Sequence, residues 1–575
     1  MESKWMLYTK RADFEKISAR FHISPVLARI IINRDIKEED FSLYLKSDLS
    51  LMHDAGRLYG VEDAYNEIMS DIKKGNKIRV VGDYDIDGVC SSYILVKSLK
   101  RFGADADVRI PDRIKDGYGI NDNIINEAAN DKISMIITCD NGIAAHSQME
   151  LARKLGIKVI ITDHHEVYQE DGKDYLPVAD VVINPKRSEC KYPFKSICGA
   201  LVAYKLMEYI FERLYGKKMY EDGELSDLLE VAAIATIGDV MPLVDENRVL
   251  VKHGLKSLMN TKNLGLRALI KATGMEGKKI SAYSIGFVIG PCLNAGGRLE
   301  NALVALNMFM SESSDEANEY AMHLKELNDE RKDLTAMNVK VAVELAEREY
   351  ADDDILVIYL ENCHESIAGI IAGRVREALG KPTIILTDAF GEDGMIKGSG
   401  RSIESYNMFE ALYEVKDIFE KFGGHHMAAG MSLKKDRLDE FRKRLNENSK
   451  LTKEDFIQKI WIDVPLPFSY ISHDFVRELE KMEPYGNKNE KPKFARKGIK
   501  ILSKNILGKN KNVVKMVLED DGTRLDGIYF CDGEAFFEEL KGNNEIDIIY
   551  YPDINEYGGR ESLQVIITGY KIKNI

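Results

Sequence analysis

Short apolar runs alternate with helical stretches through the first half of the chain. The runs are rich in isoleucine and valine and lie at 78–81, 135–139, 159–162 and 181–184. Stretches with a helical pattern, such as 142–155, separate them. Buried parallel strands that are connected by helices produce this rhythm. We therefore predict an α/β domain with a parallel sheet over residues 61–311.

A long amphipathic helix and two further domains are predicted to follow. Apolar residues recur at helical spacing through 312–351, and no proline or glycine interrupts them. This helix would lead into a second α/β domain at 352–450 and then a linker at 451–493. The pattern at 494–575 predicts three strands, a short helix and two more strands, which is the order of an OB-type β-barrel. Residues 1–60 are predicted to be a helical segment, with no role that we can assign.

Composition and charge are those of a globular protein. Hydrophobic residues make up 45% of the chain, and no run of about 18 apolar residues occurs, so no membrane span is expected. The N-terminus lacks the pattern of a secretory signal. The seven cysteines are scattered without a CxxC pair, which favours the reducing cytoplasm over a disulfide framework or a zinc site. The net charge of −14 argues only weakly against nucleic acid, because a phosphate backbone responds to local basic patches.

Three alternating carboxylates follow the first apolar run, at Asp83, Asp85 and Asp87. Residues two apart in an extended segment point to the same side, so these charges would crowd together at a strand end. Crowding costs free energy unless a cation neutralises it, and oxygen clusters of this kind hold divalent metals. A turn rich in aspartate after a strand would have the same residues, and this segment alone does not separate the two interpretations.

Three other apolar stretches end in similar groups. Asp140 follows one, the pair His164 and His165 follows another, and Asp239 follows a fourth stretch. An aspartate after a strand is often a helix N-cap, but four carboxylate-bearing strand ends with adjacent imidazoles favour a metal centre. Ligands gather beyond the carboxyl ends of parallel strands, where we expect these side chains to meet.

In order and spacing these segments resemble those of the DHH phosphoesterases. The matching segments are Asp83-Tyr84-Asp85-Ile86-Asp87-Gly88, Cys139-Asp140-Asn141-Gly142, Asp163-His164-His165 and Gly238-Asp239. Two more are similar to segments of the RecJ single-strand exonucleases within that family, namely Pro111-Asp112-Arg113 and Asn294-Ala295-Gly296-Gly297-Arg298. The resemblance implies that 61–311 is a DHH catalytic domain and that 352–450 is the accessory domain called DHHA1.

The resemblance implies a centre of two metal ions. Asp85 and Asp87 would each ligate one ion, Asp140 would bridge the two, and His164 and Asp239 would complete the contacts. Imidazole beside carboxylates suits Mn²⁺ better than Mg²⁺. Two Mn²⁺ ions are therefore expected, with Mg²⁺ as a weaker substitute.

Two further residues of the motifs receive catalytic roles by resemblance. Asp83 would lie at the edge of the centre as a ligand or proton acceptor, and His165 would face the scissile phosphate. Bridged ions lower the pKa of a water and neutralise charge on the phosphate. No residue pattern requires a serine or cysteine nucleophile.

A set of arginines, glycines and histidines is implied to bind DNA and its 5′-phosphate. Guanidinium grips phosphate in a bidentate manner, and glycine lets the backbone approach an oxyanion. The residues are Arg113, Asn294, Arg298, Arg374, Arg401, Ser402 or its neighbours, Gly424, His425 and His426. We expect 423–426 to be a flexible glycine loop. A solvated arginine beside a turn would be the plainer interpretation of Arg113 and Arg298.

The leading hypothesis is an exonuclease that hydrolyses single-stranded DNA from its 5′ end, in DNA repair and recombination. Lysines and aromatic residues between 481 and 529 suit single-stranded DNA at the barrel. The protein would be a cytoplasmic, nucleoid-associated monomer that works with a helicase and a single-strand-binding protein. Two alternatives stay open: a DHH phosphodiesterase for oligoribonucleotides or cyclic dinucleotides, and a DHH-derived scaffold that binds DNA without cutting it.

Overall fold

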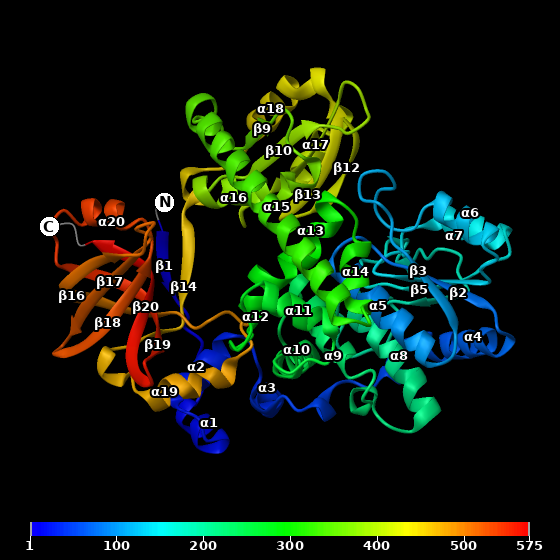
Figure 1. Cartoon of the computed structure of the whole chain (residues 1–575). Coiled ribbons are helices and arrows are strands. Elements are labelled where there is room, and N and C mark those ends of the chain that lie inside the picture. The colour runs from blue at the N-terminus through cyan, green and yellow to red at the C-terminus, as the bar shows by residue number, and fades with distance from the viewer. Residues whose placement is uncertain (1–2, 573–575) are drawn as a thin grey trace. The chain divides into compact units, whose positions relative to one another are not determined.

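The computed structural model describes residues 3–572, which form two compact units (Figure 1). One unit consists of 53–241 and 253–458, and the other of 4–52, 242–252 and the chain from 459 onwards. Within residues 3–572, no helix combines the length and apolar character needed to cross a bilayer.

The first unit opens with the predicted parallel sheet, in the order β3-β2-β4-β5-β8. Its strands are β2 (Lys77–Val81), β3 (Asp105–Arg109), β4 (Met135–Cys139), β5 (Lys158–Thr162) and β8 (Val181–Ile183). The helices α6 (Asp122–Asn130) and α7 (His146–Lys154) share one apolar core with the sheet. Strand β3 was not predicted, because it is an edge strand with polar side chains at both ends and lacks an apolar run.

Helices on the other side of this sheet deliver residues of the site. They are α5 (Ile86–Arg101), α8 (Gly199–Tyr215) and α9 (Asp227–Gly238). Helix α5 packs against both α8 and α9. Almost every side chain of α9 is buried, so this helix lacks the alternation of polar and apolar faces that marks an amphipathic helix.

The predicted connecting helix is α15 (Ser314–Glu349). Its first half packs on α11 (Leu264–Ala272), α13 (Gly290–Leu299) and α14 (Leu303–Met310). Its second half buries Ala342 and Ala346 in the core of the following domain. One continuous helix therefore joins the catalytic and accessory domains of the first unit.

The accessory domain is built on a mixed sheet in the order β12-β13-β11-β10-β9. Its strands are β9 (Leu356–Tyr359), β10 (Thr383–Asp388), β11 (Met395–Arg401), β12 (Phe419–His425) and β13 (Ala428–Lys434). The segment 423–426, expected to be a flexible loop, instead lies in the hairpin of β12 and β13, where Gly423 pairs with Gly430 and Gly424 with Ala429. Gly424 has a φ of 155°, and a Cβ there would lie 2.4 Å from the carbonyl oxygen of Ala428. Close approach within a hairpin, rather than flexibility, accounts for this glycine.

The second unit contains the predicted barrel. Its main elements are β16 (Phe494–Leu507), β17 (Val513–Asp520), β18 (Thr523–Phe530), α20 (Gly533–Leu540), β19 (Glu545–Tyr557) and β20 (Arg560–Ile572). Strand β16 pairs with β17 on one side and with β19 on the other, which closes the sheet. The three strands, helix and two strands follow the predicted order.

The core of this unit extends beyond the barrel strands. Helices α2 (Pro25–Asn33) and α19 (His473–Leu479) contribute Leu27, Ile30 and Phe475, which pack in one cluster with Phe494. Strand β1 (Ser3–Leu7), in the segment predicted to be helical, pairs with β14 (Gln458–Ile462). Residues predicted as a terminal segment and a linker thus complete an apolar core, a partnership between distant segments that local periodicity does not reveal.

Candidate metal centre

Four side chains from different elements converge beyond the parallel sheet. Asp87 lies in the first turn of α5, Asp140 follows β4, and His164 follows β5. Asp239 was expected at a strand end but is the C-cap residue of α9. A short, fully apolar run has the same appearance in a buried helix and a buried strand, which is why this assignment was wrong.

His164 lies at the middle of the cluster. Its Nε2 atom is 3.1 Å from Asp140 Oδ1, 3.5 Å from Asp87 Oδ2 and 3.7 Å from Asp239 Oδ2. Two sets of ligand atoms each lie within 4.8 Å of one another: those of Asp87, His164 and Asp239, and those of Asp140, His164 and His165. Because His164 belongs to both sets, one imidazole joins carboxylates from three elements.

Two helix N-termini orient the acidic side chains. Asp85 is the N-cap of α5, and its Oδ1 accepts hydrogen bonds from the backbone N–H groups of Asp87 (2.9 Å) and Gly88 (3.0 Å). The carboxylate of Asp87 accepts from the N–H groups of Gly199 (2.6 Å) and Ala200 (2.8 Å) at the start of α8. Free N–H groups at helix N-termini favour anionic partners, so both helices hold a carboxylate in a fixed orientation.

The centre has buried polar atoms that make no hydrogen bond among the described residues. They are His164 Nδ1, Asp239 Oδ2 and Asp140 Oδ1, the last of which is close to His164 Nε2 but without the geometry of a hydrogen bond. A buried polar atom without a partner costs about 1–3 kcal/mol. Asp140 also has a φ of 59°, which is strained for a residue other than glycine. Unsatisfied oxygen and nitrogen atoms at a strained turn fit a divalent cation of the kind bound by mixed carboxylate and imidazole ligands.

Electrostatics support the same fit. Burial, followed by the charge of Asp85, raises the pKa of Asp83 to about 8. Burial, followed by the charges of Asp87 and Asp85, raises the pKa of Asp239 to about 8 and that of Asp140 well above its usual value. These carboxyl groups resist ionising together, and a cation would remove that resistance.

Asp163 is a site residue for which the sequence pattern predicted no role. Its carboxylate accepts from the backbone N–H groups of Ile143 (2.9 Å) and His164 (2.7 Å), and its Oδ1 lies 2.8 Å from His165 Nδ1. Burial alone would lower the pKa of His165, but the hydrogen bond and charge of Asp163 outweigh it and raise that pKa to about 9. Asp163 therefore holds the His165 ring in place and keeps it protonated. Its position directly before the two histidines was the available signal.

Arginines from three parts of the first unit gather beside the centre. Arg298 donates a hydrogen bond of 2.7 Å to the carbonyl of Ser366 in the accessory domain. Burial, followed by the nearby charges of Arg113 and Arg331, lowers the pKa of Arg298 to about 10. Arg401 also adds to this positive field. Arg331 lies on α15 and was not predicted as a site residue, because no sequence signal separates it from the other charged residues of that helix.

Several residues predicted to bind DNA have structural partners instead of an open face. Asn294 Oδ1 accepts from the N–H of Ile86 (2.9 Å) and so ties α13 to the metal-site loop. Ser402 is fully buried and donates to the carbonyl of Tyr406. Its neighbour Ser399 lines a cavity.

The remaining predicted residues lie along the accessory domain. The Nη1 atom of Arg374 lies 3.5 Å from Glu377 Oε2. His426 Nε2 lies 3.0 Å from the carbonyl of Glu404, while His425 is exposed at the end of β12. They border the accessory sheet and do not enter the metal cluster.

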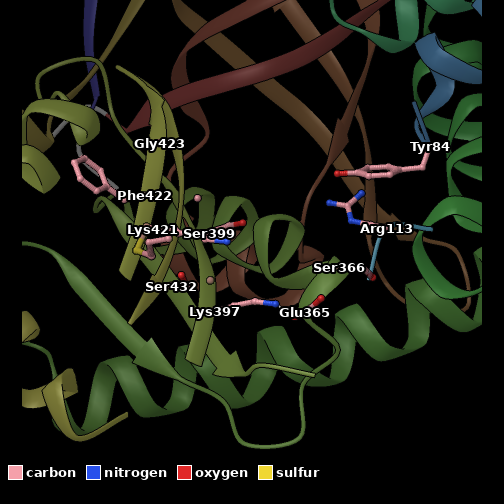
Figure 2. A pocket seen from close by; sticks show the side chains of 13 residues that line it. Tyr84, Arg113, Glu365, Ser366, Lys397, Ser399, Lys421, Phe422, Gly423 and Ser432 are labelled. Atoms are coloured by element: carbon pink, nitrogen blue, oxygen red, sulfur yellow. Dashed lines mark ion pairs between the residues drawn. The ribbon is translucent and has the colours of Figure 1, made fainter. Parts of the chain in front are cut away.

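A cavity of about 420 Å³ opens between the metal-site loops and the accessory sheet. Figure 2 shows Tyr84 and Arg113 on one side and Lys421, Phe422 and Gly423 on the opposite side. The Arg113 guanidinium lies 4.7 Å from the centre of the Tyr84 ring. The cavity thus combines cations with aromatic rings, as nucleotide sites do.

Three family models match the chain in sequence. They are the DHH family N-terminal domain at 77–236, the DHHA1 domain at 352–450 and the RecJ OB domain at 462–569. The order of these matches is the order of the domains described above.

Similar proteins extend over nearly the whole chain. It is 35% identical to the single-stranded-DNA-specific exonuclease RecJ of Bacillus subtilis, covering 99% of this chain and 71% of that one. It is 32% identical to the RecJ of Escherichia coli, covering 95% of each. The crystal structure of Thermus thermophilus RecJ with Mn²⁺ has a TM-score of 0.84 at 25% identity, covering 100% of this chain and 80% of that one. The resemblance inferred from the motifs is thus confirmed, and the chain belongs to the RecJ family of single-stranded-DNA-specific exonucleases.

Proposed function

We propose that the chain is a metal-dependent 5′→3′ exonuclease that hydrolyses phosphodiester bonds of single-stranded DNA. The observation that carries the proposal is the position of His164 Nε2, within 3.1–3.7 Å of carboxylates from three elements. Relatives named single-stranded-DNA-specific exonucleases, which match 99% and 95% of the chain, support it. A relative that is 30% identical was solved bound to manganese.

Two Mn²⁺ ions would be held by the converging side chains, with Mg²⁺ as a weaker substitute. Asp87, Asp140, His164 and Asp239 offer the ligand atoms, and Asp83 and Asp85 stand beside them as further ligands implied by the motifs. When bound, such ions neutralise charge on the phosphate and lower the pKa of a water. Imidazole nitrogen among carboxylate oxygens favours manganese.

The chain's own residues would position the strand end. Arg113, Arg298 and Arg401 form a positive field beside the metal centre and would hold the terminal 5′-phosphate. The first phosphodiester bond would then lie over the carboxylates. Because the end is gripped by its phosphate, degradation would proceed from the 5′ end.

His165 would act on the scissile phosphate. Asp163 holds its Nδ1 side. The Nε2 side, which lies 3.4 Å from the Tyr118 hydroxyl, would donate a hydrogen bond to a phosphate oxygen. A pKa of about 9 means that the ring carries its proton at neutral pH. The ring would thereby stabilise negative charge as the 3′-oxygen leaves.

The proposal also covers the selection of single strands and the cellular context. The cavity is walled by both domains of the first unit, so a duplex would be excluded sterically while a single strand could enter. The barrel has the OB architecture that binds single strands in other proteins. We further propose a cytoplasmic monomer that acts in repair and recombination with a helicase and a single-strand-binding protein. Its catalytic domain, connecting helix and accessory domain would divide at the predicted boundaries 61–311, 312–351 and 352–450.

One assay tests the proposal against its alternatives. Purified protein is incubated with 5′-phosphorylated single-stranded DNA, duplex DNA, an RNA oligomer and cyclic di-AMP, each with Mn²⁺ and with EDTA. We expect Mn²⁺-dependent loss of the single-stranded DNA from its 5′ end. Degradation of RNA or the dinucleotide alone would favour a phosphodiesterase of those substrates. No turnover of any substrate would favour a DNA-binding scaffold.

A further inference from the structure

The cavity extends from Arg113 onto a face of the accessory sheet (Figure 2). Strand register aligns the side chains of β11, β13 and β12 in rows across this face. The rows are Arg401–Ala428–His425, then Ser399–Gly430–Gly423, then Lys397–Ser432–Lys421. Successive rows are two residues apart, roughly 7 Å along the strands. A ligand anchored at Arg401 would therefore reach the lysine row after passing Ser399.

The lysine row contains a cation without a carboxylate partner. Lys397 Nζ lies 3.0 Å from Glu392 and 3.9 Å from Glu365. Among residues 3–572, no carboxylate lies within ion-pair distance of the Lys421 ammonium. The two lysines stand on either side of Ser432, about 10 Å apart at the backbone. Their long side chains can converge above the serine hydroxyl.

Two glycines form the floor in front of this row. Gly423 and Gly430 pair across β12 and β13, and a Cβ added to either would meet no atom within 4 Å. Neither glycine has a φ in the left-handed region. A glycine inside a strand costs about 0.5–1 kcal/mol relative to alanine, yet neither packing nor backbone strain requires one here. Space for a ligand lying close to the sheet would explain both.

We propose that this face is a second anion subsite that receives the outer phosphates of a strand end carrying a 5′-diphosphate or 5′-triphosphate. The proposal rests on the proposed function, because Arg113 and Arg401 must hold the first phosphate. A linear polyphosphate would extend from these arginines over the glycine floor to Lys397 and Lys421, with the hydroxyl of Ser432 as a further donor. The cavity is larger than one terminal phosphate requires, and it offers cations at both ends.

One acidic side chain in the cavity would repel a bound polyphosphate. Glu365 lines the same cavity, and its Oε2 atom is buried without a hydrogen-bond partner among the described residues. Its charge would repel the outer phosphates and limit the affinity. Removing that charge should therefore strengthen the binding of a polyphosphorylated end more than that of a monophosphorylated end.

The test compares one single-stranded DNA sequence with a 5′-hydroxyl, a 5′-phosphate and a 5′-triphosphate. Binding to the full-length protein is measured by fluorescence anisotropy in EDTA. We expect the triphosphate end to bind about threefold to tenfold more tightly than the monophosphate end, as a few solvent-exposed and therefore screened cation–phosphate contacts allow. Lys421→Ala should remove most of this ratio and Glu365→Gln should increase it. Lys416→Ala is the matched control, because this exposed lysine lies 4.4 Å over the Tyr413 ring and does not line the cavity.

A second variant tests the floor without removing charge. Gly430→Ala should lower the triphosphate ratio while the melting temperature does not fall, because alanine suits a strand better than glycine. Equal binding of triphosphate and monophosphate ends by the unaltered protein would overturn the proposal. So would a Lys421→Ala variant that loses affinity for all three ends by the same factor. The ratio of 5′-phosphate to 5′-hydroxyl binding tests the proposed end recognition separately, so either ratio can fail alone.

Discussion

The backbone N–H of Gly199 donates a 2.6 Å hydrogen bond to the carboxylate of Asp87. This contact is possible because the first residue of α8 packs directly against the segments that carry Asp87 and Asp140. A Cβ at position 199 would lie 2.8 Å from Asp140 Cβ and 3.0 Å from Asp87 Oδ2. The absence of a side chain at Gly199 therefore determines how closely two ligand-bearing segments approach.

Gly199→Ala should weaken Mn²⁺ binding by about tenfold or more, because the added methyl group displaces Asp140 or Asp87. Loss of the hydrogen bonds that orient metal-ligating side chains typically lowers metal affinity by about this factor. Isothermal titration of the metal-free protein with Mn²⁺ measures the effect. Gly286→Ala is the matched control, since a Cβ there would meet only Ile237 Cγ2 at 3.9 Å. Unchanged Mn²⁺ affinity in Gly199→Ala would show that α8 does not position the ligands.

Asp140→Ala should lower turnover of single-stranded DNA by at least about a hundredfold, because it removes the carboxylate nearest to His164 Nε2. The measurement is the initial rate with saturating DNA and Mn²⁺. Circular dichroism serves as the folding control. Asp140→Asn should be nearly as inactive, since it keeps the shape and loses the charge. Turnover near that of the unaltered protein would refute the role assigned to Asp140.

The stabilisation by Mn²⁺ should grow as the pH rises from about 6 to about 9. Asp83 and Asp239 have pKa values of about 8 in the folded chain and about 3.9 when unfolded. Because folding raises both pKa values, protonation of these two carboxyl groups adds to the free energy of unfolding. This added stability is complete below about pH 4 and is lost as the pH rises through about 8. Mn²⁺ replaces the departing protons.

Thermal melting with and without Mn²⁺ across this pH range measures the effect. Asp83→Asn should flatten the pH dependence of the metal-free protein, because one of the two raised groups is gone. A shift in melting temperature that is the same at each pH would contradict the assigned pKa values.

Arg298→Ala should reduce the preference for a 5′-phosphate over a 5′-hydroxyl end by about tenfold, as expected for one charge-assisted hydrogen bond. Arg298 also bonds to Ser366, so the variant can lose general activity as well. The ratio of kcat/KM for the two ends separates these effects. Arg298→Lys should keep part of the preference because it keeps the charge. An equal loss on both ends would mean that the arginine only joins the two domains.

Phe530→Ala should weaken binding of single-stranded DNA by about fivefold or more without changing the slope of affinity against salt. The Phe530 ring is 65% exposed on β18 of the barrel, and stacking of a base on an aromatic ring contributes about 1–3 kcal/mol. Lys509→Ala should instead reduce the salt slope by nearly one unit if that lysine contacts a phosphate. Anisotropy titrations at several salt concentrations measure both. No change in either variant would argue that DNA does not cross this part of the barrel.

The sequence alone was sufficient for much of the architecture. Runs such as 135–139 are apolar at every position, and α15 repeats its apolar residues without interruption. Burial imposes these patterns locally, so they can be read without knowing the partners. The barrel strands also follow the predicted order. The motifs around Asp140 and His164 indicated the metal centre because the carboxyl ends of parallel strands must meet at one edge.

Only the tertiary structure determined which groups face one another. It placed Asp239 at a helix end, showed that Asp163 holds His165, and brought Arg331 from α15 to the arginines. It also showed that Gly423, Gly424 and His425 pair with β13 in a hairpin. These contacts depend on the packing of segments far apart in the chain. The pattern of polar and apolar residues around one position does not show which distant segment packs against it. Periodicity shows which side of an element is buried, but contacts between distant elements decide what lies against it.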